Sequence, residues 1–307
     1  RPMLTTDTTL FYRAIQSADD LFGRLTDFNL PQVAIRRRGL NFRDEYTLFS
    51  GLELSWRHTS ALRLLGAEEQ RTAGAGLLSG HTGGAGGMRA FDFEEDEPLM
   101  PCLASVRFSD RNYLLGARVA ASGRFGRGWS AGAAVDARTG RDMHVEGVFT
   151  NALTAAFRLA KRFDGNRELS LLAVVPPSVR GTRLSSTGEA FTLTGDRLYN
   201  PAWGFQNGRV RNSRVRRETV PLLLASFRMP LSAATSFAAA VAVEAGLRKY
   251  SALGWYDART PMPDNYRSMP SYTGDRETEE AWRGRDTRYT QIRWDELIAQ
   301  NRMAGGE

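Results

Sequence analysis

The stretch from residue 219 to residue 247 constrains the fold more than any other part of the chain. Two runs, 219–229 and 235–247, are separated by the short break 230–234. In the second run Phe237, Val241 and Val243 fall on one face of an extended chain, whereas Glu244 falls on the other. A period of two is typical of a β-strand. This stretch therefore predicts an antiparallel hairpin with one wholly apolar face.

Two classes of protein use such a hairpin. In a membrane β-barrel the apolar face meets lipid and the small or charged face meets the interior. In a soluble β-sandwich the apolar face packs against a second sheet and the other face meets water. The hairpin alone leaves both interpretations open.

The same alternation recurs from residue 99 onward. Candidate strands are 102–109, 113–122, 129–138, 149–163 and 169–175. The clearest is 129–138, where Trp129 and Val135 share one face and Asp136 and Arg138 the other. Asp164-Gly165-Asn166 is a strong hairpin-turn signal. Pro176-Pro177 is expected to end the strand 169–175. The sequence predicts an all-β fold with about seven antiparallel strands.

The breaks between these strands alternate in length. They are longer at 139–147, short at 164–166, very long at 178–217, short at 230–234 and very long after 249. Outer-membrane barrels alternate short periplasmic turns with long external loops, whereas long structureless loops are uncommon in a compact soluble domain. With Trp129, Phe163 and Phe237 near strand ends as candidates for an aromatic girdle, this pattern favours a barrel.

Charged side chains in the strands lie opposite the apolar stripe, as expected for the interior of a barrel. An arginine on the lipid face near the midplane would cost about 2–4 kcal/mol. The residues are Arg118, Asp136, Arg158, Arg228 and Glu244.

Residues 1–97 follow a different pattern, with weak alternation. Short strands are expected at 32–38 and 46–54, with a turn at 38–41, and short helices at 19–28 and 60–69. The glycine-rich stretch 74–87 matches no phosphate-binding motif and indicates close backbone packing or turns. The acidic stretch 91–97 is expected to be a solvated loop rather than a metal site.

Composition narrows the possible partners. The 307 residues carry a formal charge of +7. The arginines cluster in breaks between strands, as at 209–217, which fits anionic lipid headgroups or an anionic ligand better than nucleic acid. Cys102 is the only cysteine, which excludes an internal disulfide and a cysteine metal cluster. Because the chain opens at Arg1, we expect a piece of a longer protein.

No catalytic, metal or cofactor motif is predicted. The three histidines, His58, His81 and His144, lie far apart and show no zinc-binding spacing. A nucleophile elbow is missing too. Adjacent acids such as Glu279 and Glu280 are typical of solvated faces, so the chain is not expected to be an enzyme.

Two loop motifs resemble a known family. The string 199–212, YNPAWGFQNGRVRN, and the string 251–272, SALGWYDARTPMPDNYRSMPSY, are separated by one hairpin. Both resemble loops of the TonB-dependent outer-membrane receptors of Bacteroidetes, in the same order. Weaker similarities occur at 145–152 and at the hairpin around Gly126–Trp129, and the later part of the plug domain of that family resembles 36–54 and 83–87.

The resemblance implies a partial plug domain over residues 1–97 and the N-terminal part of a transmembrane barrel over 98–307. It implies energy-coupled uptake across the bacterial outer membrane, with outer-membrane lipid, a TonB-type periplasmic protein and a surface lipoprotein as partners. The start of the plug, the TonB-contacting box and most barrel strands have no counterpart in this chain, which by itself could neither close a barrel nor transport.

Aromatic and polar residues of the two long loops are the candidate ligand contacts, because aromatic rings with nearby charges can stack on sugars or grip peptides. Packing of the loops against one another is the alternative role. The candidates are Trp203, Phe205, Asn207, Trp255, Tyr256, Asp257, Asp264, Tyr266 and Arg267.

Two alternative functions remain open at this point. A soluble, secreted β-sandwich that binds or cleaves carbohydrate would place large apolar residues on both sheet faces. A passive porin-like or adhesin barrel would lack the plug.

Overall fold

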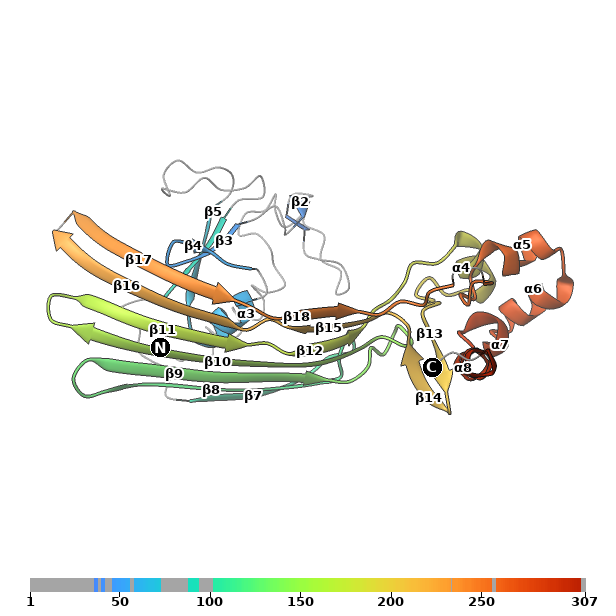
Figure 1. The fold of residues 1–307 in the computed structure, drawn as a ribbon, viewed down its shortest axis with the longest axis horizontal. Coiled ribbons are helices and arrows are strands. Elements are labelled where there is room, and N and C mark those ends of the chain that lie inside the picture. Colours follow the sequence, from blue (N-terminus) through green and yellow to red (C-terminus); the bar gives the residue numbers. More distant parts are fainter. Residues whose placement is uncertain are drawn as a thin grey trace.

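The computed structural model describes residues 36–37, 40–41, 46–55, 58–72, 88–93, 102–232, 234–255 and 258–304. The helix expected at 19–28, the glycine-rich stretch 74–87 and the domain boundary at 97/98 lie outside these residues, as do Tyr256 and Asp257. The described residues divide into a long antiparallel sheet, a small N-terminal α+β unit and a loop region (Figure 1).

The main sheet contains ten strands. Their bounds are β7 Leu103–Phe108, β8 Leu115–Phe125, β9 Trp129–Thr139, β10 Phe149–Phe163, β11 Arg167–Val175, β12 Ser178–Gly181, β15 Val215–Thr219, β16 Leu222–Ser232, β17 Thr235–Glu244 and β18 Leu247–Tyr250. All pair in antiparallel fashion. The predicted antiparallel, mainly β character of the chain from residue 102 to residue 250 is confirmed.

Three of these strands continue the strand before them. Pairing with β10 places Val175 opposite Ala155 and Ser178 opposite Ala152, an equal step on both strands. The register is likewise unchanged from β16 to β15 and from β17 to β18. The ten strands therefore form seven long passes, as the alternation predicted. Pro176-Pro177 ends β11 at Val175, as expected, and β12 then resumes the pairing with β10 in the same register.

One face of the sheet, the convex face, carries the large apolar side chains. Because the register is constant, the alternate residues of all passes share it. They include Val119, Val135, Phe157, Val175, Phe227 and Val241, and most of these side chains are exposed.

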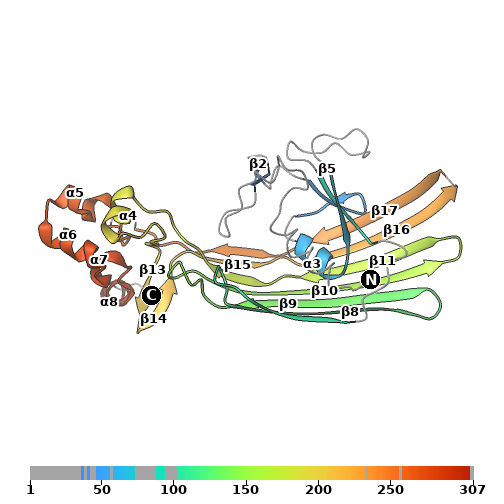
Figure 2. The ribbon, with the colours of Figure 1, turned by 180° about the vertical axis from the view of Figure 1, so that it is seen from behind.

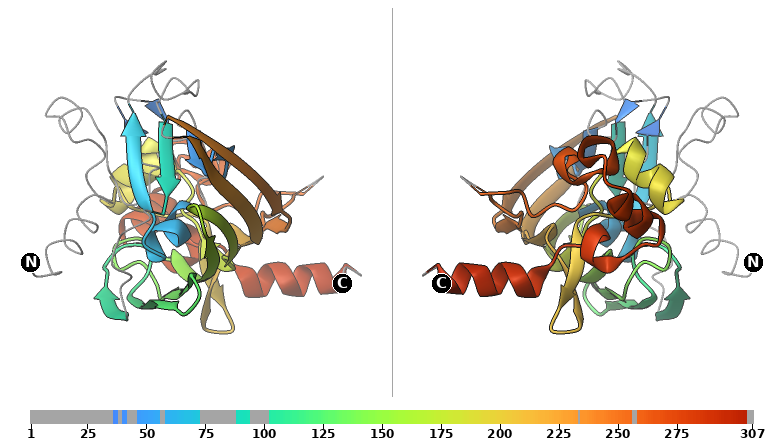
Figure 3. Two further views of the ribbon diagram at one scale, coloured as in Figure 1. Left: turned by 90° about the vertical axis from the view of Figure 1, so that its left-hand side faces the viewer. Right: turned by 90° about the vertical axis from the view of Figure 1, so that its right-hand side faces the viewer.

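The opposite, concave face combines small and charged side chains with an apolar cluster of Leu172, Val174, Leu222 and Leu224, and the N-terminal unit covers this cluster. This unit contains β3 Tyr46–Phe49, β4 Leu52–Glu53, α3 Thr59–Leu64, β5 Glu68–Thr72 and β6 Met88–Asp92, with β1 Arg36–Arg37 and β2 Leu40–Asn41 as a separate pair. Phe49, Leu62 and Phe91 pack against Leu172 and Leu224 of the sheet. Seen along the strands, α3 lies on the inner side of a curved wall (Figure 3).

Charged residues join the N-terminal unit to the wall. Asp92 of β6 forms an ion pair with Arg228 of β16, and buried His58 lies 3.4 Å from Glu244 of β17. The guanidinium of Arg158 lies 4.1 Å from the ring centroid of Phe93. The prediction of a solvated acidic loop was therefore wrong for Phe91 and Asp92, which belong to a strand.

Connections at the two ends of the sheet differ in length. Short turns join β8 to β9, β10 to β11 and β16 to β17 at one end, and longer connections leave the other end (Figures 1 and 2). Positive φ angles at Gly128 and Gly165 allow two of the tight turns. We call these the short-turn end and the long-loop end.

The two longest connections are ordered rather than structureless. Residues 182–214 contain α4 Gly188–Thr194 and the hairpin β13 Trp203–Gln206 with β14 Arg209–Asn212. Residues beyond β18 contain the 3-10 turn η4 Tyr266–Ser268 and the helices α5 Pro270–Thr273, α6 Arg276–Arg283, α7 Thr287–Thr290 and α8 Trp294–Met303. Together these two segments form the loop region. No helix among the described residues is both long and apolar enough to cross a membrane.

Candidate ligand-binding region

The loop region is held together by two small apolar cores. One packs Ala190 of α4 against Met269 and fully buried Trp282 of α6. The other packs Met262, Ile292 and Trp294. Segments more than 60 residues apart in sequence are thus fixed against each other, for example by the Tyr199 hydroxyl, which donates to the Thr290 carbonyl at 2.7 Å.

The helices of the loop region begin at capping residues that the sequence supplies. Thr187 accepts from the Ala190 amide at the start of α4, and Asp275 accepts from the Glu277 and Thr278 amides at the start of α6. At the start of α7 Asp286 accepts from the Arg288 amide. The hydrogen bonds that Asp286 accepts from Arg288 lower the pKa of the Asp286 carboxyl. Such caps stabilise a short helix because they pair amides that the first turn leaves without a helical acceptor.

The candidates on the β13–β14 hairpin have mainly structural roles. Trp203 is 5% exposed and packs edge-to-face on Phe205, with ring centroids 5.4 Å apart. Asn207 and Gly208 form the two-residue turn, both with positive φ, and the Asn207 amide donates to Asp295 of α8 at 3.0 Å. Phe205 and Asn207 are exposed to solvent, whereas Trp203 is not.

Asp264 is also turned inward. The Ser186 hydroxyl donates to its carboxylate at 2.8 Å, and burial raises the pKa of Asp264 above its ordinary value. This contact joins the segment before α4 to the segment before η4. We infer that Asp264 positions the loops rather than meeting a ligand.

Tyr266 and Arg267 form an exposed aromatic and cationic surface. The rings of Tyr266 and Tyr272 meet edge-to-face with centroids 5.5 Å apart, and both are more than half exposed. The Arg267 Nε donates to the Tyr266 hydroxyl at 2.9 Å, which raises the pKa of Arg267. Rings held in place with free faces can stack on sugars or planar groups, and a guanidinium can pair with anionic groups.

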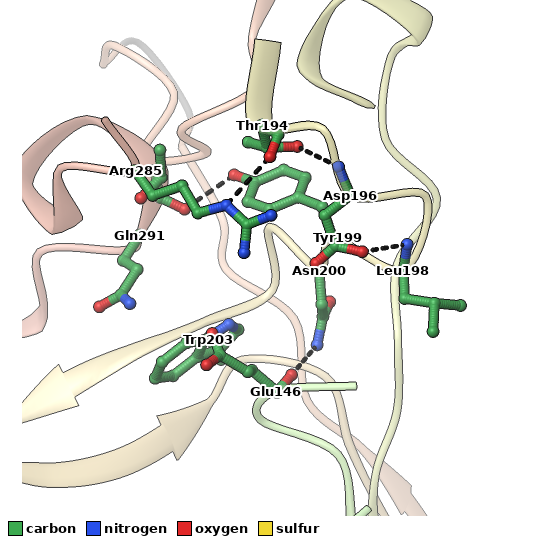
Figure 4. A pocket seen from close by; sticks show the side chains of 10 residues that line it. Glu146, Thr194, Asp196, Leu198, Tyr199, Asn200, Trp203, Arg285 and Gln291 are labelled. Atoms are coloured by element: carbon green, nitrogen blue, oxygen red, sulfur yellow. Dashed lines mark hydrogen bonds between the residues drawn. The ribbon is translucent and has the colours of Figure 1, made fainter. Parts of the chain in front are cut away.

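A small cavity in the loop region is lined by residues between Thr194 and Trp203, by Arg285 and Gln291, and by Glu146 (Figure 4). Its volume of about 70 Å³ accommodates a few water molecules only, whereas sites for organic ligands are commonly 300–1,000 Å³, by order of magnitude. Asn200 within it is saturated: its amide donates to the Glu146 carbonyl, and its oxygen accepts from the Leu184 and Ala202 amides. Among the predicted candidates that the structure describes, Trp203 alone lines the cavity.

The structure therefore separates the candidates instead of gathering them. The β13–β14 hairpin and α5 lie on different sides of the loop region in Figure 1. Trp255 is half exposed on the connection that leaves β18. Sequence reasoning missed the stabilising roles of Asn200 and Arg285, whose Nε donates to the Thr194 carbonyl at 2.9 Å, because their partners are remote in sequence.

The described residues contain no group of three or more histidine, cysteine or acidic side chains placed to hold a metal ion. His144 instead pairs with Asp110 at 2.8 Å, linking two loops at the long-loop end. This hydrogen bond lowers the pKa of the Asp110 carboxyl.

No protein-family model matches the chain, and no curated protein matches its sequence.

Proposed function

We propose that this chain forms part of a TonB-dependent receptor of the bacterial outer membrane: a wall of barrel strands with a partial plug domain against its inner side. The observation that carries the proposal is the convex face. Across seven passes it presents apolar side chains to the outside, and no described residue packs over it as a second layer.

The height of this apolar face fits a bilayer. On β10 the convex residues from Leu153 to Phe163 are all apolar except Lys161. They span about 33 Å along the strand, or about 25 Å for a strand tilted by 40°, which is the height of the lipid-facing band of outer-membrane barrels.

The concave face fits a barrel interior. Buried Asp136 there pairs with Arg107 and with Arg138, and Arg158 pairs with Glu168 at 2.8 Å. All of these charged side chains point away from the apolar face, where an unpaired charge would be costly.

Both alternatives are less well supported. A soluble sandwich needs a second sheet over the exposed apolar face, but the described N-terminal unit packs on the concave face, against Leu172, Leu222 and Leu224. A passive porin-like barrel lacks a plug, whereas α3 and the strands around it occupy the concave side.

The mechanism implied by the family resemblance is energy-coupled uptake. In this proposal the long-loop end faces outward, and the exposed rings of Tyr266 and Tyr272 are candidate first contacts for the ligand. A TonB-type periplasmic protein would pull the plug and release the ligand inward, and a surface lipoprotein could cover the loops. Outer-membrane lipid surrounds the wall, and no enzymatic step is proposed.

Lipid contact can be tested with a fluorescent label on single cysteines. Cys102→Ser removes the natural cysteine, after which Val135→Cys, Phe157→Cys and Val241→Cys place a label on the convex face. We expect blue-shifted emission and quenching by spin-labelled lipids when the full chain is reconstituted in phospholipid vesicles. Met303→Cys, on the exposed end of α8, is the matched control and should stay insensitive to the lipid quencher.

The opposite outcome would refute the proposal. A chain that stays monomeric in detergent-free buffer, with all four labels equally accessible to an aqueous quencher, is a soluble protein.

A further inference from the structure

The passes β15–β16 and β17–β18 end in two cations that face each other. Arg217 lies directly opposite Lys249 in the antiparallel ladder. Directly opposed residues have Cβ atoms about 4.5–5.5 Å apart, and like charges in such a pair destabilise a sheet. Both side chains are exposed, and among the described residues neither forms an ion pair with a carboxylate.

Neighbouring carboxylates do not neutralise this pair. Because the register continues from β17 into β18, Arg217 and Lys249 share the convex face with Leu223, Val243 and Leu247. By the same alternation Glu218 and Glu244 belong to the concave face, where Glu244 contacts Arg248 and His58. Tyr250 and Arg216 also belong to that face and contact each other.

The pair lies at a defined position along the strands of the sheet. Along the same two passes, the convex residues next to it are Thr219 and Leu247, followed by Val243 and Leu223, which are exposed apolar side chains. The row that contains the pair continues through Val179 and Asn151 and reaches Leu115 and Phe108 on the far side of the sheet. On their own two passes the cations lie beyond Leu247, Val243 and Leu223, toward the long-loop end.

We propose that Arg217 and Lys249 bind the phosphate of an anionic lipid headgroup in the membrane leaflet at the long-loop end. This inference rests on the proposed membrane function. A guanidinium can donate two parallel hydrogen bonds to phosphate, and an ammonium adds a point charge. A phosphate between them turns the repulsion into attraction, and its acyl chains lie along Leu247 and Val243.

The test measures binding of the full chain to two kinds of vesicle, phosphatidylcholine alone and phosphatidylcholine with diphosphoryl lipid A. We expect the wild-type chain to bind the second kind more tightly. The double variant Arg217→Gln/Lys249→Gln should lose about 25-fold in affinity for lipid A vesicles, roughly fivefold for each cation, and should bind neutral vesicles as the wild type does.

The matched control is Arg209→Gln/Arg302→Gln, which removes the same charge from exposed residues of β14 and α8. It should bind lipid A vesicles nearly as the wild type does. An equal loss in both double variants would reduce the effect to net charge and overturn the site. Displacement by inorganic phosphate, but not by chloride at the same ionic strength, would assign the site to free phosphate and overturn the lipid assignment.

Failure of the membrane proposal would look different. In that case the wild-type chain would bind neither kind of vesicle, which also removes the lipid site.

Discussion

Lys161 illustrates how single residues on the convex face are accommodated. It is the one charged side chain between Leu153 and Phe163 on that face of β10. Its ammonium lies 5.2 Å from the Trp129 ring centroid and 5.7 Å from that of Phe163, and it donates to the Arg127 carbonyl in the short turn. The long stem thus covers apolar surface while the charge reaches the strand ends.

A charged side chain on the convex face that cannot reach the strand ends should destabilise the protein in a bilayer. Val135→Arg places a guanidinium in the middle of the convex face, and we expect it to lower the free energy of unfolding from a bilayer by about 2–4 kcal/mol. Denaturant titration in phospholipid vesicles measures this change. Val210→Arg in β14 is the control, because Val210 is equally exposed but lies in the loop region, and equal losses for both variants would contradict a lipid-facing band.

The buried Trp282 should dominate the stability of the loop region. Trp282→Ala removes a fully buried side chain that packs on Tyr199 with ring centroids 5.7 Å apart, and we expect a loss of about 3–5 kcal/mol. Hydrogen exchange measures this loss of stability: we expect faster exchange in α4 and α6 and unchanged exchange in β8–β11. Tyr272→Ala, at an exposed ring, should leave both regions as they are.

Asp264 gives the loop region a pH dependence. Burial raises the pKa of its carboxyl in the folded state, so the unfolded chain releases this proton at lower pH than the folded chain. Burial of Asp264 therefore does not destabilise the fold below the usual aspartate pKa. As the pH rises above that value, the destabilisation increases. Asp264→Asn should stabilise the loop region at neutral pH and should be neutral in acid, as measured by thermal unfolding at several pH values. Equal stability of both proteins at neutral pH would contradict this.

At the scale of elements, three neighbouring passes are interrupted at one level of the wall. The interruptions are Pro176-Pro177, Val220-Pro221 and Ala245-Gly246, and the register is the same on both sides of each. Prolines remove amide donors there. A Cβ at Gly246 would lie 2.1 Å from the Thr219 carbonyl oxygen, so glycine permits the close approach of the two strands.

Gly246→Ala should therefore separate β18 from β15. We expect faster hydrogen exchange at the amides of Arg216–Thr219 and Leu247–Tyr250, because the Thr219 backbone must move. Gly254→Ala is the control, since a Cβ there meets no atom within 4 Å. Unchanged exchange in the Gly246 variant would show that the strands tolerate the methyl group.

The alternation of side chains predicted every long strand, because a strand with one apolar face has a strong period of two. It could not predict β12, β13 and β14, which are four residues long and have no apolar alternation. Asn207-Gly208 was a usable hairpin signal within the long connection. The separation of Tyr266 from Trp203 could not be predicted from the sequence, because it depends on packing around Trp282 and Ile292.

At the scale of the whole molecule, the main sheet ends in two edges. Among the described strands β7 pairs only with β8 and β17 only with β16, and Val106 and Phe108 on β7 are strongly exposed. Open edges with apolar side chains template further pairing. This agrees with the proposal that more strands complete the wall.

The full chain should accordingly need an amphiphile to remain dispersed. We expect aggregation in detergent-free buffer and a single species with retained β-structure in mild detergent, as measured by sedimentation velocity and circular dichroism. A dispersed, folded species without detergent would contradict the proposed wall.

Because each pass keeps one register across its interruption, the number of residues in a pass can change only in certain steps. Adding or deleting one codon within a pass would exchange the two faces for every residue beyond it, so that Arg217 or Lys249 would point to the interior and Glu218 to lipid. Natural variants should therefore change these passes by pairs of codons, whereas a single-codon change within the loop region exchanges no faces in the main sheet.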